Sequence, residues 1–281
     1  MPSQRGGMPR GGMPRVAVAV TTTPAADAAV RLAAREAALR GYELRLVCGL
    51  ILDASGKVGS YPAAEEALER AASAAREVAA ELTLSTAIHE STLTAAILRE
   101  SHLADLIVID DGELTPDTAG SMELPAIQVA SQAECTVLIG RAAGRHEGPV
   151  LVGVDSSAGG ERALEFAFEA AALRQSELIV VRVVADDESD PDGVIAVHLA
   201  DTVEPWQEKY PGVRVSREVR YGAPAPVLVD LSRDAGLVVV GACGHRPLSA
   251  PLAPVAQAVL RHASCPTAIV RRIPPTERAP R

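Results

Sequence analysis

An internal repeat constrains this sequence more than any other feature. The segment VAVAVTTTPAADAAVRLAAREAALRGYELRLVCGL, which starts at Val16, aligns without a gap with VLVGVDSSAGGERALEFAFEAAALRQSELIVVRVV, which starts at Val150. Further along, ADLIVIDDGE from Ala104 aligns with AGLVVVGACG from Ala235, and ECTVLIGR from Glu134 aligns with SCPTAIVRR from Ser264. Repeats of this length are the size of ordinary domains, so we interpret the chain as a tandem duplication of one fold.

Within each repeat, the spacing of apolar residues switches between two and about 3.6, which is typical of strands alternating with helices. In the first repeat this pattern predicts strands at 16–20, 44–50, 82–90, 106–110 and 136–140, with helices at 25–40, 62–81, 92–103 and 122–132. In the second it predicts strands at 150–154, 178–184, 213–219, 237–240 and 266–270, with helices at 158–174, 196–210, 224–231 and 254–262.

This alternation predicts an α/β fold with two tandem doubly wound domains, each built on a largely parallel five-stranded sheet. We expect a first domain at 15–141, a linker at 142–148 and a second domain at 149–272, with disordered tails at 1–14 and 273–281. The last strand of each domain should lie at a sheet edge. A strand at a sheet edge has a row of unpaired backbone N–H and C=O groups. We therefore expect these strands to pair with each other or with a second chain in a homodimer.

Charge and cysteine content exclude several classes of partner. The net charge is −9, and no stripe of Lys and Arg interleaved with aromatic residues appears, so nucleic acid and anionic membranes are not expected partners. The four cysteines are spread singly, which indicates neither a zinc site nor a disulfide framework and favours the reducing cytoplasm. No apolar run approaches the roughly 18 residues needed to span a bilayer.

Candidate ligand-binding residues follow the strands, because ligands of open α/β sheets bind beyond the carboxyl ends of the strands. Asp155 follows the strand at 150–154, where its carboxylate can accept hydrogen bonds from a ligand; the alternative is that Asp155 or Ser156 only caps the next helix. Gly241 and Gly244 follow the strand at 237–240 and suit either a phosphate-binding turn or a tight turn without a ligand. His245 comes directly after them.

These motifs together resemble the universal stress protein family. The resemblance rests on Val-Gly-Val-Asp opening the second repeat, Tyr221-Gly222-Ala223-Pro224 before a helix, Leu-Val-Val-Val-Gly-x-x-Gly, and His-Ala-Ser-Cys-Pro before the last strand. It implies an adenine nucleotide alpha hydrolase-like fold with strand order 3-2-1-4-5, and an ATP site marked by Gly-x-x-Gly, nine residues, then Gly-Ser/Thr. The nucleotide-binding residues it implies are Asp155, Val184, Gly241, Gly244 and His245.

The signature is incomplete in the second repeat and absent from the first. Pro254 and Val255 occupy the Gly-Ser/Thr position, and Pro247 and Pro251 remove further amides from the same loop. In the first repeat Thr21 replaces the aspartate, and the acidic residues Asp110, Asp111 and Glu113 occupy the glycine-rich turn. Because carboxylates repel a triphosphate, we expect a non-binding first copy and a weakened ATP site in the second.

Three functions remain open from the sequence. The first is a regulatory stress-response protein with a weak nucleotide site, without catalytic or metal-binding residues and with at most slow ATP hydrolysis. The second is a ligand-free dimerisation or scaffold module. The third is an ATP-consuming enzyme of the pyrophosphatase-loop type, which Ser157-Ala158-Gly159-Gly160-Glu161-Arg162 matches only loosely because it lacks the Asp-Ser of that loop. Cys243, between the two glycines, is either buried or an exposed reactive thiol.

Overall fold

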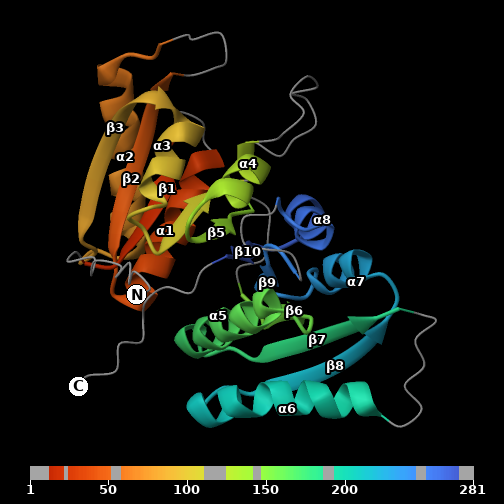
Figure 1. Ribbon diagram of the computed structural model, residues 1–281. Helices are drawn as coiled ribbons and strands as arrows, with labels where there is room; N and C mark the ends of the chain where they lie inside the picture. Colours follow the sequence, from red (N-terminus) through yellow and green to blue (C-terminus); the bar gives the residue numbers. More distant parts are fainter. Residues whose placement is uncertain are drawn as a thin grey trace, which may run out of the picture.

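The chain folds around one continuous, strongly twisted β-sheet with helices on both faces (Figure 1). The computed structural model describes residues 13–21, 25–51, 58–110, 125–141, 147–185, 193–244 and 251–271. Elements of the first half are β1 (Arg15–Ala19), α1 (Ala25–Arg40), β2 (Glu43–Ile51), α2 (Tyr61–Val78), β3 (Leu84–Thr92), α3 (Leu93–Glu100), β4 (Leu106–Ile109), α4 (Pro125–Gln132) and β5 (Thr136–Ile139). Those of the second half are β6 (Val150–Val154), α5 (Ala158–Arg174), β7 (Leu178–Val184), α6 (Val194–Lys209), β8 (Val215–Tyr221), α7 (Pro224–Leu231), β9 (Leu237–Gly241), α8 (Pro254–His262) and β10 (Thr267–Val270).

The strand order of the described chain is β3-β2-β1-β4-β5-β10-β9-β6-β7-β8. Each half therefore has the predicted order 3-2-1-4-5, and all neighbours within a half are parallel. Strands β5 and β10 pair antiparallel, with Leu138 opposite Ala268. The last strand of each half thus lies at the edge of its own half and pairs with its counterpart within the chain, which joins the two halves into a single sheet.

Several helix ends differ from the sequence-based prediction. Helix α3 covers Leu93–Glu100 instead of 92–103, because Thr92 caps its start by accepting a hydrogen bond from the backbone N–H of Ala95 (3.3 Å). At its end, the Ser101 hydroxyl donates to the carbonyl of Leu98 and accepts from the backbone N–H of Glu134 (3.2 Å). Helix α2 ends at Val78 instead of residue 81, and residue 213 precedes β8. The expected start of α4 at 122–124, residues 1–12 of the N-terminal tail and the whole C-terminal tail lie outside the described residues. At the end of the N-terminal tail, the carbonyl of Pro14 accepts a hydrogen bond from the backbone N–H of Glu43 (3.0 Å).

Successive strand residues point to opposite faces of the sheet, and this alternation builds two cores. Val16, Val18 and Leu44 pack against α1 and α2, and the same face continues across the second half under α5 and α6. The other face, which includes Ala17 and Ile107, is covered by α3, α4, α7 and α8. No helix in the described part of the chain has both the length and the apolar character needed to cross a bilayer.

A buried ionic cluster joins the halves where α1 meets α5. Glu36 is 1% exposed and forms ion pairs with both Arg40 and Arg174. Nε of Arg40 lies 3.5 Å from a carboxylate oxygen of Glu169. Removing one partner from a buried group of charges leaves an uncompensated charge, which is strongly destabilising, so this cluster favours the observed contact between the two helices.

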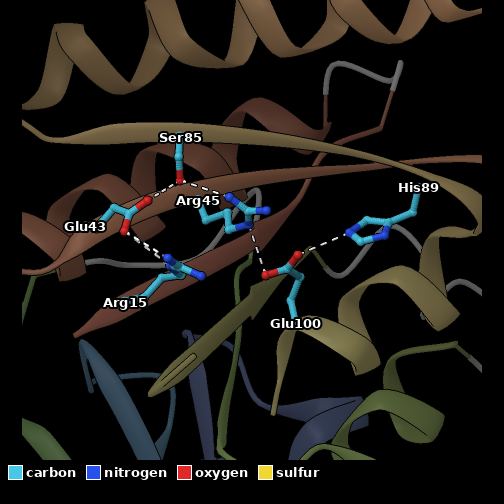
Figure 2. A network of polar contacts seen from close by, with 6 residues as sticks. All are labelled: Arg15, Glu43, Arg45, Ser85, His89 and Glu100. Carbon is cyan, nitrogen blue, oxygen red and sulfur yellow. Dashed lines mark hydrogen bonds and ion pairs between the residues drawn. The ribbon is translucent and has the colours of Figure 1, made fainter. Parts of the chain in front are cut away.

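A second polar network lies in the first half, on the face of the sheet covered by α3 (Figure 2). Glu100 is 3% exposed; its carboxylate lies 3.0 Å from Nε of Arg45 and 3.1 Å from Nε2 of His89. The other members of this network are Arg15, Glu43 and Ser85. At the equivalent positions of the second half, Ile179 replaces Arg45 and Leu231 replaces Glu100. The repeated fold therefore carries different chemistry on the same face of its two copies.

Candidate nucleotide site

A cavity of about 160 Å³ lies at the carboxyl ends of the strands in the second half. Its walls come from the ends of β6, β7 and β9 and from the first turns of α7 and α8. Strand β6 has β7 on one side and β9 on the other, so the strand order reverses at this point. This is the place where open α/β sheets bind ligands.

Asp155 has two roles at this cavity. Its Oδ1 accepts a hydrogen bond from the backbone N–H of Ser157 (3.0 Å) and another from the Ser157 hydroxyl. The Ser157 hydroxyl in turn accepts from the backbone N–H of Gly160 (3.1 Å) and so caps α5. The residue that caps the helix is therefore Ser157, and Asp155 holds that cap in place. Oδ2 of Asp155 lies 3.5 Å from the point where a Cβ on Gly244 would stand, so the carboxylate also borders the cavity.

Glycines allow the start of α5 to pack directly against the end of β9. A Cβ on Gly241 would lie 2.7 Å from the carbonyl oxygen of Gly159, and a Cβ on Gly160 would lie 2.6 Å from the carbonyl oxygen of Asp155. Such contacts are too close for any side chain. Gly244 has φ +54°, a left-handed conformation that favours glycine. The glycines of the predicted phosphate turn thus have a packing role as well as their position beside the cavity.

The other wall of the cavity is the first turn of α8. This helix starts at Pro254, and its cap residue Ala253 provides no side-chain hydrogen bond. The backbone N–H of Ala253 donates to the carbonyl of Ala242 (2.7 Å), which ties the helix start to the turn after β9. Val255 retains its amide, but it places an apolar side chain at the cavity where the family signature has a hydroxyl. First-turn amides of a helix have no intrahelical acceptor and suit an anionic group.

The structure brings Asp155, Gly241 and Gly244 together at the cavity, as the sequence predicts for a shared site. Val184 is 4% exposed and is not among the residues that line the cavity; the preceding residue, Val183, lines it. The reason is strand alternation, which turns neighbouring side chains to opposite faces. His245 lies outside the described residues.

The structure also defines the surroundings of two further residues, Cys243 and Gly153. Cys243 is 2% exposed, so the alternative of an exposed thiol there is wrong. Gly153 also lines the cavity, and its Cβ would lie 2.7 Å from a methyl of Leu228, so a larger residue would fill this space. The sequence signal for Gly153 was available as a glycine inside a buried strand, where glycine often marks a close approach.

The first half has different residues at the equivalent positions. Asp110 follows β4 where Gly241 ends β9, and its side chain is buried, with 8% exposed. Thr21 stands in place of Asp155, and Ala19 stands in place of Gly153. Asp111 and Glu113 lie outside the described residues. In the described part of the chain, no group of three His, Cys, Asp or Glu residues could hold a metal ion.

Comparison with known proteins agrees with this description. Residues 148–271 match the model of the universal stress protein family. A universal stress protein of Mycolicibacterium smegmatis is 30% identical over 286 aligned positions, which cover 91% of this chain and 96% of that protein. A universal stress protein of Mycobacterium tuberculosis is 40% identical over 134 positions, covering 44% of this chain and 45% of that protein.

The fold is also known from crystal structures. A universal stress protein from Archaeoglobus fulgidus DSM 4304 superposes with a TM-score of 0.68 at 17% identity, covering 92% of this chain and 96% of that one. This likeness, at so low an identity, concerns the fold, whereas the relative from Mycolicibacterium smegmatis matches in sequence along almost the whole chain. The chain therefore belongs to the universal stress protein family, in a tandem arrangement of two family folds.

Proposed function

We propose that this protein is a stress-response regulator whose second half binds an adenine nucleotide weakly. The observation that carries this proposal is the cavity at the reversal of strand order, bordered by the Asp155 carboxylate on one strand and by Gly241 and Gly244 after the neighbouring one. In this proposal the binding unit is 149–272, the first unit is 15–141, and residues 142–148 link them. We place the protein in the cytoplasm, since its four cysteines are all free and buried.

Each part of the cavity suits one part of such a ligand. Val181, Val183 and Leu228 offer apolar contact for a base. The Asp155 carboxylate accepts hydrogen bonds, which suits ribose hydroxyls or a base amine. The backbone amides at the start of α8, after Pro254, suit a phosphate, because the first turn of a helix combines unpaired donors with the positive end of the helix dipole.

Weak binding follows from what the cavity lacks. Its volume, about 160 Å³, is below the roughly 300–1,000 Å³ of typical ligand pockets. Val255 provides a methyl group where the family signature has a hydroxyl, so one hydrogen bond to phosphate is missing. Gly159 and Gly160 pack closely against Gly241 and Asp155, so packing accounts for these glycines without the loop chemistry of an ATP-consuming enzyme.

The experiment is to release and identify any nucleotide carried by the purified full-length chain, and then to titrate the emptied protein calorimetrically with ATP, ADP and AMP. Weak but saturable binding of at least one of them supports the proposal. Release of phosphate or pyrophosphate in the same samples tests for hydrolysis, which we expect to be slow or undetectable.

The second candidate function is a ligand-free scaffold. The small cavity volume and the apolar Val255 favour it. Under this alternative the purified protein carries no nucleotide, and titration with all three nucleotides gives no heat beyond dilution. A homodimer formed by the last strands is not needed in either case, because β5 and β10 already pair within the chain.

A further inference from the structure

We infer that Arg141, a residue of the first half, positions the wall of the ligand cavity in the second half. This inference rests on the proposed nucleotide site and adds to it the part of the molecule that holds the site in shape. Under it, the first half supports binding indirectly, by holding a wall of the site, although its own copy of the site is degenerate.

Arg141 lies at the junction between the halves. Arg141 comes two residues after the end of β5 and is 8% exposed. Its guanidinium donates a hydrogen bond through Nη2 to the backbone carbonyl of Leu260, which belongs to α8 of the other half. Leu260 lies in the last turn of α8, where carbonyls have no intrahelical donor and the helix dipole is negative. A buried guanidinium is well suited to hold such a helix end.

The other end of the same helix forms the cavity wall. Helix α8 contains nine residues, from Pro254 to His262, and both Val255 and its cap residue Ala253 line the cavity. Because hydrogen bonds make a short helix move as one piece, anchoring Leu260 also restrains Val255 and Ala253. Arg141 therefore acts on the cavity through helix α8, from one end of the helix to the other, and does not itself touch a ligand.

A reciprocal contact shows that this arrangement belongs to the repeat. Arg271, at the position equivalent to Arg141, donates through Nε to the carbonyl of Ala130 in α4 of the first half (3.0 Å). Ala130 is in turn the counterpart of Leu260 in the aligned repeats. Each half thus holds the last turn of the other half's helix. At the far end of α8 lies the cavity, whereas the residues that precede α4 lie outside the described part of the chain.

The test compares the wild-type full chain with Arg141→Met, Arg141→Lys and a control, Arg174→Met. The control removes the same kind of side chain from a buried contact between the halves, the pair of Arg174 with Glu36, but on the opposite face of the sheet. Hydrogen exchange at the amides of α8, thermal unfolding and nucleotide affinity are measured for all four proteins.

We expect Arg141→Met to speed exchange in α8 by about tenfold or more, the loss expected for one hydrogen bond from a charged donor. Nucleotide affinity should fall by about fivefold or more, because the first turn of α8 is no longer held in place. Arg141→Lys, which keeps a charged donor, should recover part of both effects. Arg174→Met should lower the unfolding temperature yet leave α8 exchange and affinity close to wild type.

Equal α8 exchange in Arg141→Met and wild type would overturn the inference, as would a loss of affinity in Arg174→Met as large as in Arg141→Met. If Arg141→Met fails to fold, the same measurements on Arg141→Lys and Arg174→Met are compared instead, and they decide whether Arg141 holds α8 in place. If the wild-type protein binds no nucleotide, the proposed function fails, and the exchange data still decide whether Arg141 holds the cavity wall.

Discussion

Equivalent strands of the two halves end in residues of different character, a glycine in the second half and a buried aspartate in the first. At the end of β9, Gly241 lets the start of α5 approach so closely that a single Cβ would meet the carbonyl of Gly159 at 2.7 Å. At the same point after β4, the first half has the buried side chain of Asp110. The comparison shows that a duplicated fold keeps its strands and helices with either residue, whereas the close backbone approach beside the cavity requires glycine.

The largest expected effect comes from adding one methyl group to Gly241. Gly241→Ala forces α5 and β9 apart, and overpacking of this kind costs about 1–3 kcal/mol of unfolding free energy. We expect nucleotide binding to be lost as well, because the turn beside Asp155 shifts. Urea unfolding followed by the fluorescence of Trp206, the only tryptophan, measures the stability of the second half.

Gly212→Ala is the matched control for this variant, since a Cβ there would meet nothing within 4 Å. It should leave stability and binding nearly unchanged. If Gly241→Ala behaves like Gly212→Ala, the close approach of α5 and β9 is not what separates the two halves.

The second-largest effect is expected at Asp155, where two substitutions distinguish its role in binding from its role in supporting the cap of α5. Asp155→Asn keeps an oxygen for the backbone N–H and hydroxyl of Ser157, so stability should stay near wild type while affinity falls about tenfold, the loss expected for a charged acceptor. Asp155→Ala should lose binding and, in addition, about 1 kcal/mol of stability, because the cap of α5 is no longer supported.

Thr21→Ala, at the equivalent position of the first half, serves as the control and should leave affinity unchanged. Calorimetric titration and urea unfolding measure both quantities. An affinity of Asp155→Asn equal to that of wild type would show that the carboxylate serves the helix cap alone.

A third, smaller effect is a gain of affinity. Val255→Ser restores a hydroxyl at the cavity and should tighten nucleotide binding by about fivefold to tenfold through one added hydrogen bond. Pro254→Gly should add little, because proline at the first helical position removes no intrahelical hydrogen bond and Val255 already supplies an amide. Titration of ATP into the single and double variants measures this; no tightening in any of them would indicate a closed pocket and a ligand-free scaffold.

The smallest expected effect is the response of the first half to acid. Burial raises the pKa of the Glu43 carboxyl, but hydrogen bonds from Ser85 and Arg15 and the charges of Arg15 and Arg45 outweigh burial and hold that pKa below its ordinary value of 4.5 (Figure 2). A carboxyl with a lowered pKa in the folded state adds stability above its unfolded pKa, and this stability is lost as the pH falls through the folded pKa.

Glu43→Gln should therefore lower stability at neutral pH and flatten the loss of stability below pH 4.5. Glu177→Gln, at the equivalent and exposed position of the second half, should change neither the stability at neutral pH nor its loss in acid. Hydrogen exchange in β2 and β3 as a function of pH measures the effect. Parallel pH profiles for Glu43→Gln and wild type would contradict it.

The repeat and the alternation of strands and helices were sufficient to predict two doubly wound domains. The strand order and the meeting of Asp155 with Gly241 were predicted only through the resemblance to the universal stress protein family, because alternation alone does not determine which strands are neighbours. The sequence predicted Val184 as a site residue, whereas Val183 lines the cavity. An error of one residue along a strand is enough for this, because neighbouring side chains point to opposite faces of the sheet. Nor did the sequence indicate the contact of Arg141 with Leu260. Those residues lie far apart in the chain, and only the antiparallel pairing of β5 with β10 brings them together.

The central claim, that the second half alone provides the nucleotide site, is tested most directly by photoaffinity labelling. The intact chain is irradiated with an azido-adenine nucleotide, the stoichiometry is measured by native mass spectrometry, and the labelled peptides are mapped. The account predicts at most one nucleotide per chain, with the label confined to peptides that line the cavity between Gly153 and Val255 and absent from Gly241→Ala. Two nucleotides per chain, or a label on the first half that persists in Gly241→Ala, would contradict it.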